Sequence, residues 1–193
     1  QSRGLGDVYK RQEQGGIWHD KQSWYIPLFC AILILTVKKT NKQRRKRIMK
    51  TADVIIVGSG ASGLFNALFL PQDYKVIVIT KKEVEESDSF LAQGGISALK
   101  NPEDYDSYFE DTMKAGHYEN DKGAVEKMIK ESPQIIQDLK DFGVRFDLKD
   151  GEIEFTREGG HSTFRILHHE DLTGKEITSH LYEEAKKRDN ITI

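Results

Sequence analysis

Residues 53–63, with the sequence DVIIVGSGASG, decide the fold of this 193-residue chain. Val54–Val57 is an unbroken apolar, β-branched run, which is typical of a strand buried on both faces. Residues 64–70 carry apolar side chains at helical spacing until Pro71, and a second apolar run occupies residues 76–79. This order of strand, glycine-rich turn, helix and strand predicts an α/β fold that opens with a Rossmann-type βαβ unit.

The glycine turn predicts a dinucleotide-binding site. Gly58 lets the chain turn sharply off the strand, Gly60 lets the backbone approach a pyrophosphate, and Gly63 lets the helix pack closely on the sheet. The diphosphate would lie at the helix N-terminus, where free N–H groups and the helix dipole favour an anion. A GxGxxG pattern alone is weak, but here a strand precedes it and a helix follows it.

The end of the second predicted strand lacks the acidic residue that usually binds a ribose hydroxyl. The segment there is Thr80-Lys81-Lys82, and Glu83 comes only just beyond it. Either Glu83 takes that role, or the site uses Lys81 and backbone groups instead. This difference weakens the case for NAD and leaves FAD open.

The formal net charge of −2 averages two unlike parts of the chain. Residues 1–48 carry 11 Lys and Arg against 3 Asp and Glu, whereas residues 49–193 carry 18 against 28. The acidic second part argues against non-specific binding of nucleic acid, which needs a basic surface. The one cysteine, Cys30, lies in the first part, so residues 49–193 offer no thiol for a disulfide, a zinc site or a nucleophile.

Residues 1–48 are expected to be a non-native or upstream translated segment. Residues 1–12, QSRGLGDVYKRQ, resemble a translated sequencing-library adapter, and a basic cluster at residues 44–47 precedes Met49, the expected initiator. The apolar run at residues 26–37 is shorter than the roughly 20 residues of a spanning helix, so no stable membrane association is expected. A short signal anchor with its basic flank in the cytoplasm remains the alternative.

The rest of the chain is predicted to be mainly structural. Helices are expected at residues 105–115, from a cap at Asp121, and at residues 133–143, while Asp150-Gly151 predicts a hairpin turn. A fourth helix is expected to open with a capping box formed by Thr173 and Glu176, and a strand to begin at residue 190. The spacing of His161, His168 and His169 fits no zinc pattern, so no metal site is expected.

Two further segments carry a family resemblance. Residues 85–96 are polar and then glycine-rich, and the Ala92–Gly95 part resembles the AQGG segment of the succinate dehydrogenase, fumarate reductase and L-aspartate oxidase flavoproteins. Residues 157–168 contain REGGHS and RILH, which resemble L-aspartate oxidases specifically, and residues 171–174 contain the Asp-x-Thr-Gly shared by all three groups. Gly94 and Gly95 would also allow the backbone to approach a flat ligand.

This resemblance implies that residues 49–193 are the N-terminal part of a Rossmann-type FAD-binding domain, incomplete at its C-terminus and without the capping and C-terminal domains. The expected cofactor-binding residues lie in the first glycine turn, at the end of the second strand and in the second glycine loop; they are Gly58, Ser59, Gly60, Ala61, Ser62, Gly63, Lys81, Asp88, Ser89, Phe90, Leu91, Ala92, Gln93, Gly94 and Gly95. Asp88 stands where the dehydrogenases and fumarate reductases carry a flavin-linked histidine, so FAD is expected to bind non-covalently.

The resemblance also implies a substrate. Glu158 matches the family glutamate that orients the α-amino group of L-aspartate, and His161 is expected near the flavin or the substrate. The implied reaction is oxidation of L-aspartate to iminoaspartate in the cytoplasm, the first step of NAD synthesis through quinolinate. Oxygen or fumarate would reoxidise the flavin, and a functional link to quinolinate synthase follows. The family's proton-transferring arginine lies later in the chain, so the fragment alone is expected to be inactive.

Two other functions stay open from the sequence. One is a fumarate reductase or succinate dehydrogenase flavoprotein subunit, against which Glu158 and the missing flavin-linking histidine speak. The other is a membrane-tethered, non-catalytic nucleotide-binding module that uses residues 26–37 as its anchor.

Overall fold

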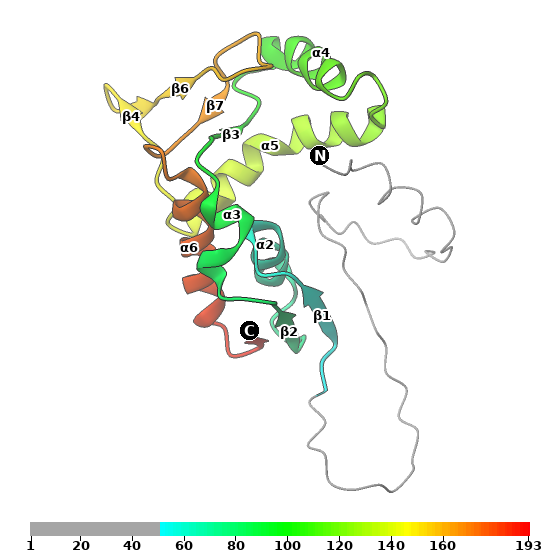
Figure 1. Cartoon of the computed structure of the whole chain (residues 1–193), viewed down its shortest axis with the longest axis vertical. Helices are drawn as coiled ribbons and strands as arrows, with labels where there is room; N and C mark the ends of the chain where they lie inside the picture. Colours follow the sequence, from blue (N-terminus) through cyan, green and yellow to red (C-terminus); the bar gives the residue numbers. More distant parts are fainter. Residues whose placement is uncertain (1–50) are drawn as a thin grey trace, which may run out of the picture.

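The computed structural model describes residues 51–193, and it has the α/β fold that the sequence predicts (Figure 1). The expectations for residues 1–48 and for Met49 lie outside the described residues. The first described elements are β1 (Val54–Val57), α2 (Ala61–Phe69), β2 (Val76–Ile79), η1 (Val84–Glu86), α3 (Asp88–Leu91), β3 (Ile96–Ser97) and η2 (Pro102–Asp104). They are followed by α4 (Tyr105–Ala115), α5 (Lys122–Asp141), β4 (Leu148–Lys149), β5 (Glu152–Ile153), β6 (Phe155–Thr156), β7 (Ile166–Leu167), α6 (Thr173–Lys186) and β8 (Ile191–Thr192).

The parallel sheet has the strand order β1-β2-β8 and confirms the predicted βαβ unit. Val54 pairs with Val76 and Val57 with Ile79, so both apolar runs lie in register. Alternate side chains of the two strands are buried with Ala67 of α2. Val57 and Ile79 remain 56% and 49% exposed, so the runs that predict burial on both faces are fully buried on one face only.

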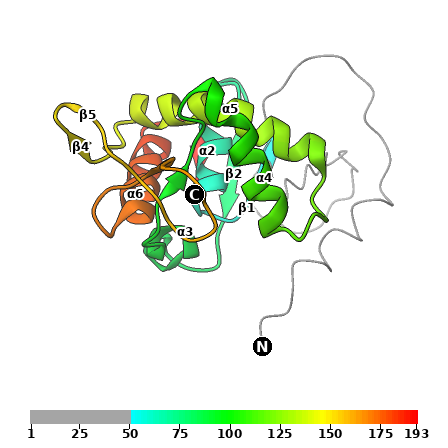
Figure 2. The same cartoon turned by 90° about the horizontal axis from the view of Figure 1, so that it is seen from above.

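A second, antiparallel sheet lies at the other end of the structure, with the order β3-β7-β6 (Figure 1). The predicted hairpin is present as β4 and β5, and it projects away from the helices (Figure 2). Asp150 and Gly151 between these strands both have positive φ, 54° and 86°. Two consecutive residues with positive φ match the right-handed twist of a tight hairpin, as the Asp-Gly pair predicts.

The main apolar core lies where α2, α5 and α6 meet. It joins Leu64 and Leu68 of α2 to Ile136 of α5 and to Leu181 and Ala185 of α6. The apolar stripes predicted for these helices are therefore confirmed as core. In Figure 1, α5 extends from α4 toward α6 and so connects the two ends of the structure.

The expectation of two separate helices between residues 121 and 143 is wrong, because α5 is continuous through Pro133. A proline inside a helix leaves the carbonyl four residues earlier without its N–H donor. Here that carbonyl belongs to Ile129, and the Ser132 hydroxyl donates to it at 2.7 Å. The same hydroxyl accepts the Leu99 N–H at 2.8 Å, so Ser132 compensates the break and also fastens the chain after β3 to α5.

Two local expectations also need correction. Thr173 is not the N-cap of α6; the helix starts at Thr173 itself, and the Thr173 hydroxyl accepts the His169 N–H instead of capping the helix. The polar and glycine-rich composition of residues 85–96 predicts an irregular loop, but the Ser87 hydroxyl accepts the Phe90 N–H and starts the single helical turn α3.

Replacement of Gly63 by alanine is expected to lower the free energy of unfolding by about 3 kcal/mol. A Cβ at this position would overlap the carbonyl oxygen of Gly58, which is part of the rigid turn between β1 and α2. Urea unfolding of the Gly63→Ala protein would measure the loss. The matched control is Gly159→Ala, because a Cβ there meets nothing within 4 Å. Equal stability of the two variants would contradict the close packing of α2 on β1.

Candidate functional site

The turn between β1 and α2 has the geometry of an anion site. Gly58 has φ +113°, a conformation that side chains rarely adopt, and this turns the chain from the strand into the helix. No side chain caps the N-terminus of α2, and its first turn holds no acidic residue. The Ser62 hydroxyl is buried and has no hydrogen-bond partner among residues 51–193. An uncapped helix N-terminus and an unpartnered hydroxyl fit a bound diphosphate.

The ends of the first two strands are tied together beside this turn. The hydroxyl of Ser59 donates to Thr80 Oγ1 at 2.8 Å, and Thr80 in turn donates to the Lys82 carbonyl at 2.8 Å. Lys81 lies between these two residues with an exposed side chain. The structure therefore places Lys81 next to the glycine turn, but shows no contact from its side chain to that turn among the described residues.

The second glycine loop approaches the first through Ser89 of α3. A Cβ on Gly60 would come within 2.8 Å of the Ser89 hydroxyl oxygen, so the bare Gly60 backbone makes room for this side chain. Asp88 lies beside Ser89 in the first turn of α3, with an exposed carboxylate. Residues 88–94 form a largely exposed surface next to the turn, which is the arrangement expected of a loop that covers a cofactor.

The two glycines of the second loop have different roles. A Cβ on Gly95 would overlap both the side chain of Ile166 and the carbonyl of Leu167, because β3 starts in close contact with β7. Gly95 is thus required by the strand pairing, a role that the sequence interpretation did not include, while its assignment to a flat ligand stays a prediction. Gly94 is exposed, and the nearest atom to its would-be Cβ is Oε2 of Glu158, at 3.4 Å.

Glu158 reaches this loop from a segment 63 residues later in the sequence. Its Oε1 accepts the N–H of Gly95 at 2.9 Å. The Glu158 side chain is itself exposed, so its second carboxylate oxygen faces a region open to a ligand. The structure thus brings the candidate substrate residue together with the candidate cofactor loop, as the sequence motifs require.

The Asp-x-Thr-Gly segment supports the same loop from the other side. Gly174, at the start of α6, donates its N–H to the Ala92 carbonyl at 3.0 Å. A Cβ on Gly174 would overlap the backbone carbonyl of Ser89, so only glycine lets α6 begin this close to α3. The glycine of this shared motif therefore has a physical role that the sequence alone did not reveal.

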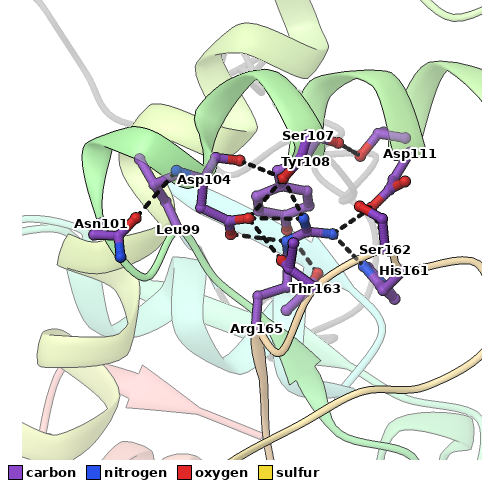
Figure 3. Close-up of polar contacts among 12 residues, drawn as sticks. Leu99, Asn101, Asp104, Ser107, Tyr108, Asp111, His161, Ser162, Thr163 and Arg165 are labelled. Carbon is purple, nitrogen blue, oxygen red and sulfur yellow. Dashed lines mark hydrogen bonds and ion pairs between the residues drawn. The ribbon is translucent and has the colours of Figure 1, made fainter.

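His161 lies against the buried side chain of Arg165 (Figure 3). The His161 N–H donates to the Glu158 carbonyl at 3.2 Å, and His161 Nδ1 lies 3.1 Å from Nη1 of Arg165. A guanidinium only donates hydrogen bonds, so Nδ1 accepts and a neutral His161 carries its proton on Nε2. The backbone of His161 therefore contacts Glu158, while the His161 ring packs edge-on against Tyr108.

Comparison with protein families matches residues 53–193 to the family described as FAD binding domain. The match includes both glycine loops, Glu158 and the Asp-x-Thr-Gly segment.

The chain belongs to the FAD-binding domain family.

Curated relatives of this FAD-binding domain include the L-aspartate oxidases of Clostridium perfringens, 44% identical over 144 residues, and of Clostridium acetobutylicum, 46% identical over 142 residues. The matches cover 75% and 73% of this chain but 33% of each relative, so the chain spans about a third of the length of these relatives. The resemblance to L-aspartate oxidases inferred from the sequence is confirmed as a similarity.

Solved structures with the same fold include a quinol-fumarate reductase with menaquinol molecules, which is 25% identical with a TM-score of 0.68. It matches over 73% of this chain and 25% of its own. The Mycobacterium smegmatis protein Sdh1 in complex with UQ1 is 29% identical with a TM-score of 0.62, over 72% of this chain and 26% of its own. The expected Rossmann-type fold and the FAD cofactor are confirmed by these matches and by the family.

The FAD-binding domain holds a buried ionic network that sequence reasoning missed. Arg165 is 0% exposed, and its guanidinium donates to Asp104 at 2.9 and 2.8 Å and to Asp111 at 2.6 Å. It also donates to Ser107 and stacks over the ring of Tyr108 (Figure 3). A signal existed in the sequence: residues 104, 107, 108 and 111 are spaced as one face of a helix, and they place two acids beside an apolar stripe.

This network shifts the pKa of each charged group in favour of its ionised form. The hydrogen-bonded Arg165 guanidinium holds the pKa of Asp104 well below its usual range, against the opposing effect of burial. Burial alone would raise the pKa of Asp111, but hydrogen bonds from Ser162 and Arg165 outweigh it, so that pKa is lowered as well. The hydrogen bond to Asp104 raises the pKa of Arg165. The three groups therefore stay charged when buried.

The other histidines of the FAD-binding domain lie apart from Glu158. His168 and His169 contact Asp147, with Nδ1 of His168 at 3.0 Å from that carboxylate, and His180 contacts Glu176. Within residues 51–193 no group of three or more His, Cys, Asp or Glu is arranged to hold a metal ion. In the same range no helix is long and apolar enough to cross a membrane, and the apolar run at residues 26–37 is outside it.

Replacement of Asp104 by asparagine is expected to lower the free energy of unfolding at pH 7 by about 3 kcal/mol, because it removes one carboxylate from a buried arginine. The pH dependence should change as well. Since folding depresses the pKa of Asp104, its ion pair stabilises fully above the unfolded pKa of about 4, and this contribution is lost as pH falls toward the folded value. Unfolding measured from pH 7 to pH 2 should show a shallower decline for Asp104→Asn than for the unsubstituted protein.

The matched control is Asp106→Asn, because Asp106 lies on the exposed face of α4. An equally steep decline in the Asp104→Asn protein and in the control would contradict the assignment of acid sensitivity to this ion pair.

Proposed function

We propose that residues 49–193 are the N-terminal part of the FAD-binding domain of an L-aspartate oxidase, which oxidises L-aspartate to iminoaspartate. The observation that carries the proposal is the contact between Glu158 and the backbone of Gly95. This contact supports the proposal because it joins an anionic side chain to the loop that, on this proposal, would line the flavin. The similarity to two clostridial L-aspartate oxidases supports the same choice of substrate.

Different segments of the chain would bind different parts of FAD. The turn at residues 58–63 and the N-terminus of α2 would hold the FAD diphosphate, and residues 88–95 would line the flavin. Bound FAD supplies the hydride acceptor for the oxidation. The protein's own contribution is then to orient the amino acid, and Glu158 has the charge to do so.

Glu158 would select the substrate by charge. One carboxylate oxygen is occupied by the Gly95 N–H, which leaves the other oxygen for the ammonium group of L-aspartate. A dicarboxylate without an amine, such as succinate, offers no partner for that oxygen. The exposed anion would therefore favour an amino acid over its deaminated analogue.

The wider role follows from this reaction. Oxygen or fumarate would reoxidise the reduced cofactor, and iminoaspartate would be passed to quinolinate synthase as the first step of NAD synthesis. We propose a cytoplasmic location for this reaction. The chain spans about a third of the length of its curated relatives, so the experiments below use the complete protein.

A fumarate reductase or succinate dehydrogenase flavoprotein is the second candidate, because solved structures of such proteins share the fold. Asp88 and Glu158 argue against it. A carboxylate at residue 88 is not expected to form the covalent flavin link of those enzymes, and the resemblance matches Glu158 to the glutamate of the L-aspartate oxidases.

Replacement of Glu158 by glutamine should lower kcat/KM for L-aspartate by about 10- to 100-fold, the loss expected for one hydrogen bond between charged groups. Glutamine keeps the acceptor for the Gly95 N–H, so the FAD content should not change. Steady-state oxidation of L-aspartate would measure the effect. Glu152→Gln, on the exposed hairpin, is the matched control. Oxidation of succinate but not of L-aspartate by the unsubstituted protein would overturn the proposed function.

Acid precipitation of the purified protein should leave the flavin in the supernatant. Residue 88 is an aspartate and not the histidine that would form a covalent link to the flavin. The absorbance of the supernatant near the flavin bands measures the released cofactor. Flavin that remained in the washed pellet would contradict non-covalent binding and would favour the second candidate.

A further inference from the structure

The segment that carries Glu158 lies mostly at the surface, yet it must hold one side chain over the cofactor loop. Residues 157–160 are all exposed. No helix or strand includes residues 157–165, since β6 ends at Thr156 and β7 begins at Ile166. We call residues 157–164 the glutamate loop. Its conformation must therefore be fixed by side-chain contacts at its ends.

One carboxylate oxygen of Asp111, a residue of α4, accepts three hydrogen bonds from this part of the chain. Oδ2 of Asp111 accepts the Ser162 N–H at 2.7 Å, the Ser162 hydroxyl at 2.8 Å and Nη1 of Arg165 at 2.6 Å. Asp111 thus binds both the backbone of the glutamate loop and the arginine that follows it. Figure 3 shows the loop drawn against α4 by these bonds.

We call Asp111 and its bonds to Ser162 and Arg165 the anchor of the glutamate loop. A second set of bonds leads from this anchor to Glu158. Nη1 of Arg165, the same nitrogen that binds Asp111, lies 3.1 Å from Nδ1 of His161. The backbone N–H of His161 donates to the carbonyl of Glu158 at 3.2 Å. The far end of the loop is fixed by Gly95, whose N–H binds the Glu158 carboxylate. Glu158 is therefore held from both sides.

We propose that Asp111 is a positioning residue that orients Glu158 through Ser162 and Arg165, and so sets the affinity for the amino group of the substrate. The part that concerns the substrate rests on the proposed function. Among residues 51–193 the hydrogen bonds of the Asp111 carboxylate go to Ser162 and Arg165, so Asp111 acts through the glutamate loop and not by a hydrogen bond to Glu158. Asp104 has a different role, because it binds Arg165 through Nε and Nη2 and the loop only at Thr163.

The Asp111→Asn substitution would weaken the anchor, but the asparagine side chain would still fill the space of the aspartate. The amide oxygen can still accept, but the charge that draws three donors to one oxygen is lost. Arg165 keeps Asp104 as its counter-ion, so the buried guanidinium is not left without a partner. We therefore expect the Asp111→Asn protein to fold, with a looser glutamate loop. Ser162→Ala is a milder second variant, because it removes only the exposed hydroxyl bond.

The first test measures the loop itself in the complete FAD-loaded protein. Hydrogen exchange of peptides that contain residues 157–164 should be faster in Asp111→Asn than in the unsubstituted protein, by about tenfold at the Ser162 amide. Ser162→Ala should show a smaller increase. Asp106→Asn, on the exposed face of the same helix, should show none. Unchanged exchange in Asp111→Asn would overturn the anchoring, whatever the substrate proves to be.

The second test measures the consequence for the substrate. Asp111→Asn should raise KM for L-aspartate by about tenfold while FAD content and the flavin spectrum stay the same, because the cofactor loops do not depend on this anchor. In a Glu158→Gln background the same substitution should have little further effect, since the charge that it positions is already gone. If Asp111→Asn raised KM just as much in the Glu158→Gln background, Asp111 would have a general structural role, and the proposal that it positions Glu158 would be wrong.

The two tests separate the two proposals. If the unsubstituted protein does not oxidise L-aspartate, the proposed function is wrong, and the exchange measurement still decides whether Asp111 anchors the loop. If L-aspartate is oxidised but KM does not respond to Asp111→Asn, the proposed function stands and the positioning inference fails.

Discussion

The fully buried guanidinium of Arg165 is the constraint on which much of this structure depends. A buried charge is costly unless it is paired and hydrogen-bonded, and here two aspartates and a serine of the α4 segment satisfy it. Because Arg165 directly precedes β7, this pairing fixes the distance between α4 and the antiparallel sheet. It also determines the path of the preceding loop, which carries Glu158. The contacts of Arg165 therefore connect the α4 segment to the loop that carries the candidate substrate residue, Glu158.

The cofactor side of the site is built on a different principle. There, backbone approaches backbone at positions where no side chain would fit: Gly63 against Gly58, Gly95 against Leu167, and Gly174 against Ser89. These contacts depend on shape and not on charge. A change of pH would therefore act on the anchor of the glutamate loop more than on the glycine loops. Since the pKa values of Asp104 and Asp111 are both lowered, the anchor remains charged throughout the neutral range.

The sequence predicted the parts of the fold that depend on local patterns. The runs before and after the glycine turn, the Asp-Gly hairpin and the apolar helix stripes all depend on neighbours close in the chain, and all are present. The expected helix break at Pro133 is absent because the neighbouring Ser132 hydroxyl bonds the Ile129 carbonyl that the proline leaves free. The bond from the distant Leu99 N–H to the same hydroxyl is one that no local pattern shows. The packing role of Gly95 could not be predicted, because a glycine pair in the sequence gives no sign of the strand that it will meet. The Arg165 network joins residues 54 to 61 positions apart, so the sequence could reveal the acidic stripe but not its partner.

The two principles meet at Glu158, so a surface segment without helix or strand could serve the proposed recognition of a substrate. Its carboxylate is held by a backbone N–H of the shape-packed loop, while its backbone is held through His161 by the charged anchor. Either contact alone would leave the side chain free to turn away. Together they fix one carboxylate oxygen and leave the other open, which costs little entropy when a cation binds. An exposed glutamate with this support is better prepared to bind an ammonium group than a glutamate on an unconstrained loop. Under the proposed function, the ion pairs of Arg165 with Asp104 and Asp111 would therefore support the candidate substrate residue without contacting the substrate themselves.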